Sequence, residues 1–288
     1  NAKSLPGFLK LTSTYSPEKN AAVPYSGLTV FSLLAWGLGY FGMPHILLRF
    51  MAIEDENKLK TSRRIASVWV VISMAVAILI GVVGNAMVKY GSIGNLEDTE
   101  RIIVEVSKLL SRHGAVAALL AGVILAGILA ATMSTADSQL LAASSSVSQN
   151  ILRDVLGLKI SEKTAIVIAR LTVVAIAVVG VLMALDENSS VFRVVSFAWA
   201  GFGASFGPVV LFALFWKRSN KWGALAGMLT GGIAVFVWKY VIRVNFAGTV
   251  FDIYELLPAF ILASVAIIVV SLLTKAPEKE IIETYESV

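Results

Sequence analysis

The sequence has no cysteine, only two histidines and little charge. Among its 288 residues, Asp, Glu, Lys and Arg together make up 15%. Without cysteine, the chain forms neither a disulfide framework nor a thiolate site. His45 and His113 lie far apart in the sequence and indicate no metal site. The small charged share argues against an ordinary soluble domain, in which about a quarter of the residues are charged.

Long apolar runs take the place of charge. Hydrophobic residues make up 57% of the chain, and the mean hydropathy is +0.80. Seven stretches are long enough, or nearly so, to cross about 30 Å of hydrocarbon as helices. The period-2 alternation of a membrane barrel is absent from the sequence, so we expect an all-α integral membrane protein. The predicted spans are 24–50, 65–90, 114–140, 164–186, 191–216, 222–241 and 256–274.

The basic residues collect at alternate ends of these spans. The net charge of +5 therefore does not indicate a nucleic-acid partner. By the positive-inside rule, the more basic loops are cytoplasmic, so the first span enters from outside and the C-terminus lies inside. The set assigned to the cytoplasmic side is Arg49, Lys58, Lys60, Arg63, Arg64, Arg153, Lys159, Lys163, Lys217, Arg218, Lys221, Lys275 and Lys279.

Polar segments flank the predicted spans. Residues 1–23 open with Asn1 and carry no signal-peptide pattern, so we interpret them as an extracytoplasmic loop of a longer chain. Residues 275–288 are interpreted as a solvated cytoplasmic tail. Residues 98–112 repeat apolar side chains at helical spacing behind a candidate N-cap, Asp98 or Thr99. This outer amphipathic helix is either a surface connector or a lid.

The first span contains a predicted break. Residues 37–42, GLGYFG, match a dinucleotide-binding pattern, but they lie inside an apolar helix instead of following a strand. The glycines there permit close helix packing, and Pro44 removes a backbone donor. Transporters use such breaks to present backbone carbonyls to their substrates; a structural kink is the alternative.

Two aromatic residues accompany the break. Trp36 and Tyr40 are spaced i, i+4, which places them on one face of a helix. They lie too deep in the span for an interfacial belt. A Trp/Tyr wall suits a small apolar ring, with the hydroxyl available to a polar group.

The third span ends in hydroxyl side chains. Ala131, Ser134, Thr135 and Ser138 share one helix face. One interpretation is structural, because membrane Ser and Thr residues bond back to carbonyls or allow helices to approach. The other is a weak cation site, in which two hydroxyls and the Ala131 carbonyl supply neutral oxygen ligands.

Asp137 is an intramembrane acid, which costs roughly 2.5–3.5 kcal/mol on the mild insertion scale and should therefore face water or a partner. It either serves a cytoplasmic exit path or pairs with a basic residue such as Arg49 or Arg170. A structural salt bridge at the inner interface is equally consistent with its place in the sequence.

The fifth span is rich in small residues, FAWAGFGASFGP at 197–208. Gly201 and Gly203 favour close helix packing or a bendable gate. No catalytic constellation appears anywhere in the sequence, so we expect no enzyme activity and no cofactor.

Three long motifs resemble the sodium:solute symporter family, and in particular its proline-transporting members. They are WGLGYFGMPHILLRFMA, AGILAATMSTADSQLLAASSS and FAWAGFGASFGPVVLFALFWKRSNKWGALAGM, and the likeness runs from about Ser32 to about Pro277. The resemblance implies Na⁺-coupled uptake of L-proline by alternating access in the bacterial inner membrane. The alternatives are a symporter for another small solute and a solute-sensing membrane domain.

The resemblance also implies a leucine-transporter-type fold with two inverted repeats. Residues 24–216 would form the second five-helix repeat and 217–274 two peripheral helices, with the N-terminal helices of the protein completing the site. Asp137 departs from the family pattern, in which we expect a hydroxyl. The implied sodium ligands are Ala131, Ser134 and Thr135, and the implied proline contacts are Trp36, Tyr40, Pro44 and the nearby Ser138.

Overall fold

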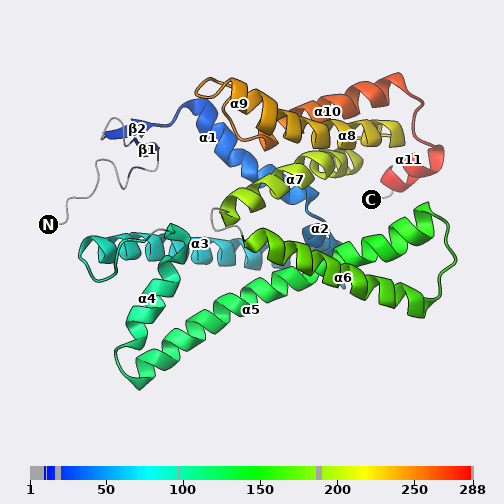
Figure 1. Cartoon of the computed structure of the whole chain (residues 1–288). Helices are drawn as coiled ribbons and strands as arrows, with labels where there is room; N and C mark the ends of the chain where they lie inside the picture. Colours follow the sequence, from blue (N-terminus) through cyan, green and yellow to red (C-terminus); the bar gives the residue numbers. More distant parts are fainter. Residues whose placement is uncertain (1–9, 11, 17–20, 97, 186–189, 287–288) are drawn as a thin grey trace. The chain divides into compact units, whose positions relative to one another are not determined.

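The computed structural model describes residues 10, 12–16, 21–96, 98–185 and 190–286 (Figure 1). Within this part of the chain, six helices are long and apolar enough to cross a membrane. A bent pair, Gly27–Gly42 with Pro44–Met51, brings the number to seven when it is taken as one span. Each of the seven predicted spans is therefore helical, which confirms the all-α integral membrane fold.

The chain divides into two compact units, which are described separately. Among the described residues, those between 52 and 174 form the first unit, and those between 10 and 51 and between 175 and 286 form the second. Helix α6, Glu162–Ala184, continues from the first unit into the second. The other elements of the first unit are η2 (Glu56–Lys58), α3 (Leu59–Lys89), η3 (Thr99–Arg101), α4 (Ile102–Ser111), α5 (Ala115–Ser145) and the π-helix η4 (Ser146–Val155).

Helix α4 is the predicted outer amphipathic helix. Asp98 caps the short η3 turn that precedes it, because its carboxylate accepts the N–H of Glu100 at 2.9 Å. Ile102 packs where a Cβ on Gly84 would lie, so the glycine lets α4 approach α3 closely. Ser107 is buried and satisfies its hydroxyl by donating to the Ile103 carbonyl at 2.8 Å. The helix thus packs against its neighbours with one face, as its apolar spacing predicted.

The third span continues well beyond its predicted end at residue 140. Helix α5 runs to Ser145 and passes directly into the π-helix η4, which ends before Gly157 at a positive φ of 64°. The hydroxyls of this polar sequence are satisfied within the helix. Ser148, for example, is buried and donates to the Ser144 carbonyl at 2.9 Å.

The second unit begins with a hairpin that the sequence did not predict. Strands β1 (Ser13–Ser16) and β2 (Ala21–Pro24) pair antiparallel, with Thr14 opposite Val23. The segment 1–23, which we interpret as an extracytoplasmic loop, therefore contains a short hairpin in its described part. Neither STYS nor AAVP shows the alternation of apolar and polar residues by which a half-buried strand is recognised. The other elements of this unit are α1 (Gly27–Leu34), η1 (Ala35–Gly42), α2 (Pro44–Met51), α7 (Val191–Phe215), α8 (Lys221–Val237), the π-helix η5 (Trp238–Ile242), α9 (Arg243–Asn245), α10 (Leu256–Leu273) and α11 (Lys279–Glu286).

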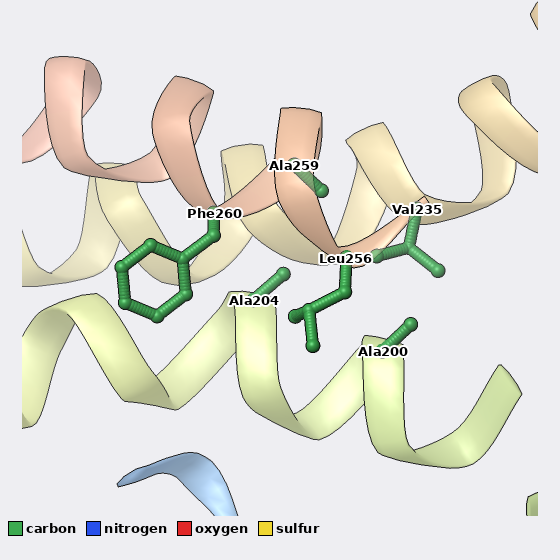
Figure 2. Packing of buried hydrophobic residues seen from close by; sticks show 6 residues of the cluster. All are labelled: Ala200, Ala204, Val235, Leu256, Ala259 and Phe260. Atoms are coloured by element: carbon green, nitrogen blue, oxygen red, sulfur yellow. The ribbon is translucent and has the colours of Figure 1, made fainter. Parts of the chain in front are cut away.

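The core of the second unit lies between α7, α8 and α10 (Figure 2). Small side chains of α7 face Leu256 of α10, so the helices approach closely. Leu256 is fully buried, and burying a leucine is worth roughly 1.5–3 kcal/mol. The buried cluster consists of Ala200, Ala204, Val235, Leu256, Ala259 and Phe260.

The segment interpreted as a solvated tail contains helix α11. Ile281 and Tyr285 are spaced i, i+4 and line a cavity of about 460 Å³ together with the ends of α7 and α8. Glu286 pairs with Lys217 at 3.4 Å. The sequence did not predict this helix, because the segment is rich in charged residues and its apolar face is short.

Candidate ion and solute sites

The first span is broken where the sequence predicted. The axis bends by 54° between Gly27–Gly42 and Pro44–Met51. Met43 lies at the bend with an extended backbone, φ −85° and ψ 113°. Its carbonyl accepts the N–H groups of Ile46 and Leu47 at 3.0 and 3.1 Å, which starts α2. Pro44 fits the first position of a helix because no N–H is needed there.

The segment before the break is wound as a 3₁₀-helix, η1, instead of an α-helix. Such a winding rarely extends beyond three or four residues, and within a longer helix it often marks a hinge or strain. Here it covers eight residues. Its glycines explain how it fits, because a Cβ on Gly39 would overlap the Trp199 indole and one on Gly42 would overlap the Phe202 carbonyl.

Helix α7 supplies the other half of this contact. A Cβ on Gly203 would lie 2.7 Å from the Cα of Gly39, so the two backbones touch. A Cβ on Gly201 would meet no atom within 4 Å, although this residue is only two positions away. Helix α7 is continuous from Val191 to Phe215 despite Pro208. The two glycines proposed as gate residues therefore differ: one packs and the other does not.

The predicted aromatic pair is part of a larger aromatic cluster. The ring of Trp36 stacks on Phe192, Trp199 and Tyr254, with centroids 5.7, 5.5 and 5.8 Å apart. Tyr40 meets Trp199 edge-on at 4.8 Å. Trp199 also donates its indole N–H to the Trp36 carbonyl at 3.0 Å. Trp36 and Tyr40 thus both contact Trp199, and Tyr40 remains half exposed.

Sequence reasoning missed the three partners of Trp36. Phe192 and Trp199 are seven residues apart on α7, a spacing that puts them on one helix face and gave a usable signal. Tyr254 lies in the loop before α10, where no periodicity points to it. Its contact with Trp36 depends on the packing of the whole unit.

The hydroxyl residues of α5 lie in the first unit. Thr135 donates its hydroxyl proton to the Ala131 carbonyl at 3.3 Å, and Ser138 donates to the Ser134 carbonyl at 3.0 Å. Ala131, Ser134 and Thr135 are exposed, whereas Ser138 is partly buried. A donating hydroxyl keeps its lone pairs. Both the structural and the ion-binding interpretation are therefore consistent with these hydrogen bonds. The neutral oxygens of Ala131, Ser134 and Thr135 lie on an exposed helix face.

Asp137 is exposed in the same helix. No ion pair of Asp137 occurs among the described residues of the first unit, so the predicted pairing with Arg170 is absent. A pairing with Arg49 would join residues of different units and stays a prediction.

A polar cavity of about 360 Å³ lies beside the π-helix η4 in the first unit. Arg153 at its edge donates to the Gln149 side chain at 3.0 Å and to the Ile160 carbonyl at 3.3 Å. Within the described chain, no group of three or more His, Asp or Glu side chains is arranged to hold a metal ion. The residues that line the cavity beside η4 include Ser144, Ser145, Ser148, Gln149, Arg153 and Glu162.

The comparisons with known proteins agree with this architecture. The model of the sodium:solute symporter family matches residues 10–231. The chain therefore belongs to the sodium:solute symporter family, a family of multi-pass membrane transporters. No solved structure gives a significant match.

Several relatives carry names that specify a solute. The chain is similar to a sodium/proline symporter of Haemophilus influenzae, 44% identical over 265 residues, which are 90% of this chain and 51% of the relative. It is also similar to an osmoregulated proline transporter of Bacillus subtilis, 43% identical over 255 residues, 88% of this chain and 50% of the relative. The sodium/proline symporter of Escherichia coli is 39% identical over 255 residues, 87% and 48% respectively. The chain spans about half the length of these relatives.

Proposed function

We propose that the full-length protein imports L-proline together with Na⁺ by alternating access. The break in the first span carries the proposal, because it places Trp36, Tyr40 and Pro44 next to backbone that is not regular α-helix. The names of the relatives, which are sodium/proline symporters and proline transporters, support proline as the solute. On this proposal, Na⁺ is the coupling ion, and the protein is not an enzyme.

The sodium site is proposed at the Ala131 carbonyl and the hydroxyls of Ser134 and Thr135. All three oxygens are neutral, so the charge of the ion is not cancelled and it is released readily. Bound sodium would favour solute binding through a reciprocal coupling, typically about 1–3 kcal/mol. Inward movement of the ion then contributes about 2.3 kcal/mol per 100 mV of membrane potential.

The solute site is proposed at Trp36, Tyr40 and Pro44, with Ser138 nearby. An aromatic wall suits the apolar pyrrolidine ring, and the half-exposed Tyr40 hydroxyl is placed to meet a polar group. Support for this role comes from the aromatic cluster, which holds Trp36 on a packed base. Asp137, Gly201 and Gly203 are proposed for the gate or the exit path.

The proposed architecture is a leucine-transporter-type fold of two inverted repeats. Residues 24–216 would form the second repeat, with 98–112 as its outer lid and 1–23 as an extracytoplasmic segment. Residues 217–274 would be peripheral, and 275–288 would be cytoplasmic in the bacterial inner membrane. Helices N-terminal to this chain would complete both sites, which agrees with the relatives being about twice as long.

Two alternatives remain open within the proposal. The same machinery would move a different small solute if the contacts supplied by the rest of the protein select against proline. A solute-sensing membrane domain would bind the solute but would not accumulate it.

Uptake of radiolabelled proline by the full-length protein in proteoliposomes decides between them. We expect accumulation that requires an inward sodium gradient. Uptake without sodium would refute the coupling, and binding without accumulation would favour the sensing domain. Competition by unlabelled solutes at equal concentration tests the choice of proline, because a stronger competitor would replace it as the substrate.

A further inference from the structure

Tyr254, in the loop between α9 and α10, contacts three other segments of the second unit. Its ring stacks on Trp36 of η1, with centroids 5.8 Å apart and planes at 20°. Its hydroxyl donates to the Ser196 carbonyl of α7 at 2.7 Å. Its backbone N–H donates to the Ser32 hydroxyl of α1, also at 2.7 Å. A single residue thus joins α1, η1 and α7.

These contacts are sheltered from water. Ser32 is only 3% exposed, and Tyr254 is partly buried. Burial, and next the charge of Glu255, raise the pKa of the Tyr254 phenol above its usual range. The phenol therefore stays protonated and remains a hydrogen-bond donor throughout the physiological pH range.

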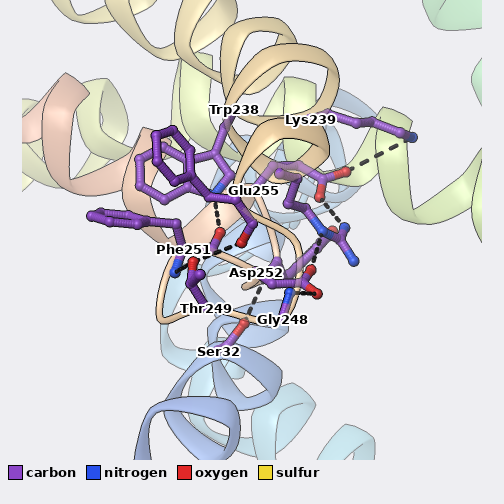
Figure 3. A network of polar contacts seen from close by, with 11 residues as sticks. Ser32, Trp238, Lys239, Gly248, Thr249, Phe251, Asp252 and Glu255 are labelled. Carbon is purple, nitrogen blue, oxygen red and sulfur yellow. Dashed lines mark hydrogen bonds and ion pairs between the residues drawn. The ribbon is translucent and has the colours of Figure 1, made fainter.

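The loop that carries Tyr254 is anchored by charge (Figure 3). Arg243 contacts the carboxylates of Asp252 at 3.0 Å and of Glu255 at 3.1 Å, and Lys239 lies 3.8 Å from Glu255. The hydrogen bond from Arg243 lowers the pKa of Asp252. The Glu255 side chain is 3% exposed, so its two cations compensate a buried charge that would otherwise be costly. These ion pairs join the loop that carries the tyrosine to η5 and α9.

The three rings that stack on Trp36 do not have the same origin. Phe192 and Trp199 belong to α7, which also packs on η1 through Gly203. Tyr254 comes from the hairpin of α8 and α10, outside the segment proposed as the repeat. The orientation of Trp36 therefore depends on a part of the chain with no proposed role in binding.

We propose that Tyr254 is a positioning residue for the solute site: it fixes the ring of Trp36 from the peripheral hairpin and so sets the affinity for the solute. The inference rests on the proposed function, in which Trp36 contacts the solute. It gives the α8–α10 hairpin an indirect part in binding, through Trp36.

The test replaces Tyr254 with Phe in the full-length protein, which keeps the ring and removes the hydroxyl bond to α7. One hydrogen bond is worth about 0.5–1.5 kcal/mol, so we expect the KM for proline to rise about two- to tenfold. We expect kcat and the sodium concentration for half-maximal uptake to stay unchanged. Tyr254→Leu, which also removes the stacked ring, should raise KM further.

A second readout follows Trp36 itself. For each variant, the fluorescence emission of Trp36 is obtained by subtraction. The spectrum of the same variant carrying Trp36→Phe is subtracted from the spectrum of the variant with Trp36 present. We expect Tyr254→Phe to change the Trp36 emission. Without its hydroxyl bond to Ser196, the ring at position 254 can change its angle to the Trp36 ring. If Tyr254 only contributed to packing, its replacement would lower the melting temperature and leave the KM for proline unchanged.

Tyr240→Phe is the matched control. Tyr240 lies on the same hairpin and its ring contacts Phe197 and Phe236, at 5.7 and 6.3 Å, instead of Trp36. The proposal is overturned if Tyr254→Phe and Tyr240→Phe give the same KM, or if KM rises without a change in the Trp36 emission. If the unmodified protein takes up no proline, the proposed function fails, and the emission alone then decides whether Tyr254 positions Trp36.

Discussion

Thr135 lies where a structural role and an ion-binding role use the same atoms. Its hydroxyl donates to the Ala131 carbonyl, so the two oxygens are neighbours on one exposed face of α5. The same bond to the carbonyl four residues earlier occurs at Thr172 of α6, where Oγ1 lies 2.9 Å from the Ile168 carbonyl. The bond alone therefore does not define a site, but the pair of threonines allows the two roles to be separated.

Replacing Thr135 with Ala should raise the sodium concentration for half-maximal proline uptake by at least tenfold. The expected size follows from the loss of one neutral ligand to a charged group, about 1.5–3 kcal/mol. Uptake at graded sodium concentrations measures the change. Thr172→Ala removes an equivalent hydroxyl bond and should leave the sodium dependence unaltered. Equal effects of the two variants would assign Thr135 a structural role.

Spacing in the sequence was a poor guide to the partners of single residues. The i, i+4 rule of the α-helix predicted one face for Trp36 and Tyr40, but both lie in the 3₁₀-helix η1, where residues i and i+3 share a face. Their common contact with Trp199 therefore comes from packing. The rule could not supply Tyr254, because a contact between residues 36 and 254 depends on tertiary packing. The absent ion pair of Asp137 with Arg170 has the same cause: sequence proximity to an interface does not fix a partner.

At the scale of elements, the contact between η1 and α7 is made by backbone. Gly39, Gly42 and Gly203 remove the side chains that would hold the two helices apart. Close approach of this kind favours dispersion contacts and weak Cα–H···O bonds. The 3₁₀-helix η1 of the broken first span therefore packs against α7, which is continuous.

Gly203→Ala should lower the stability of the full-length protein by about 1–3 kcal/mol, since the new Cβ must displace the backbone of Gly39. Thermal unfolding in detergent measures the loss as a lower melting temperature. Gly201→Ala supplies the control on the same helix, because its Cβ meets open space. It should be neutral or stabilise by up to about 1 kcal/mol through helix propensity. A larger loss for Gly201→Ala than for Gly203→Ala would contradict the packing described.

The sequence predicted elements well where apolar length decides them. The spans at 191–216 and 256–274 agree with α7 and α10 to within a residue. The π-helix after Ser145 was not predicted, because its polar residues, including the buried Ser148, resemble a loop in composition. The first hairpin was missed because its strands, STYS and AAVP, do not alternate apolar and polar residues, and α11 was missed because it is short and rich in charged residues.

At the scale of the whole molecule, the distribution of charge predicts which loops face the cytoplasm. The orientation is inferred from the unequal numbers of Lys and Arg residues in the loops on the two sides of the membrane. This inequality acts when the protein is inserted, and the packing of the helices does not reveal it. For this reason the orientation needs its own measurement. The absence of cysteine from this chain makes that measurement simple.

Single cysteines introduced into an otherwise cysteine-free full-length protein should report the orientation. Ser92 lies after α3 and Ala276 lies after α10, and both are exposed. With a maleimide that does not cross membranes, we expect Ser92→Cys to react in intact cells and Ala276→Cys to react only after permeabilisation. The reverse pattern would invert the proposed topology.

The winding of η1 has a mechanical consequence. A 3₁₀-helix rises about 2.0 Å per residue and an α-helix about 1.5 Å, so rewinding these eight residues would shorten the segment by about 4 Å. The same change, from 3.0 to 3.6 residues per turn, would rotate one end against the other by about 160°. A change in the hydrogen bonding of this segment would therefore both shift and rotate Trp36, with no change in the number of residues between its neighbouring helices.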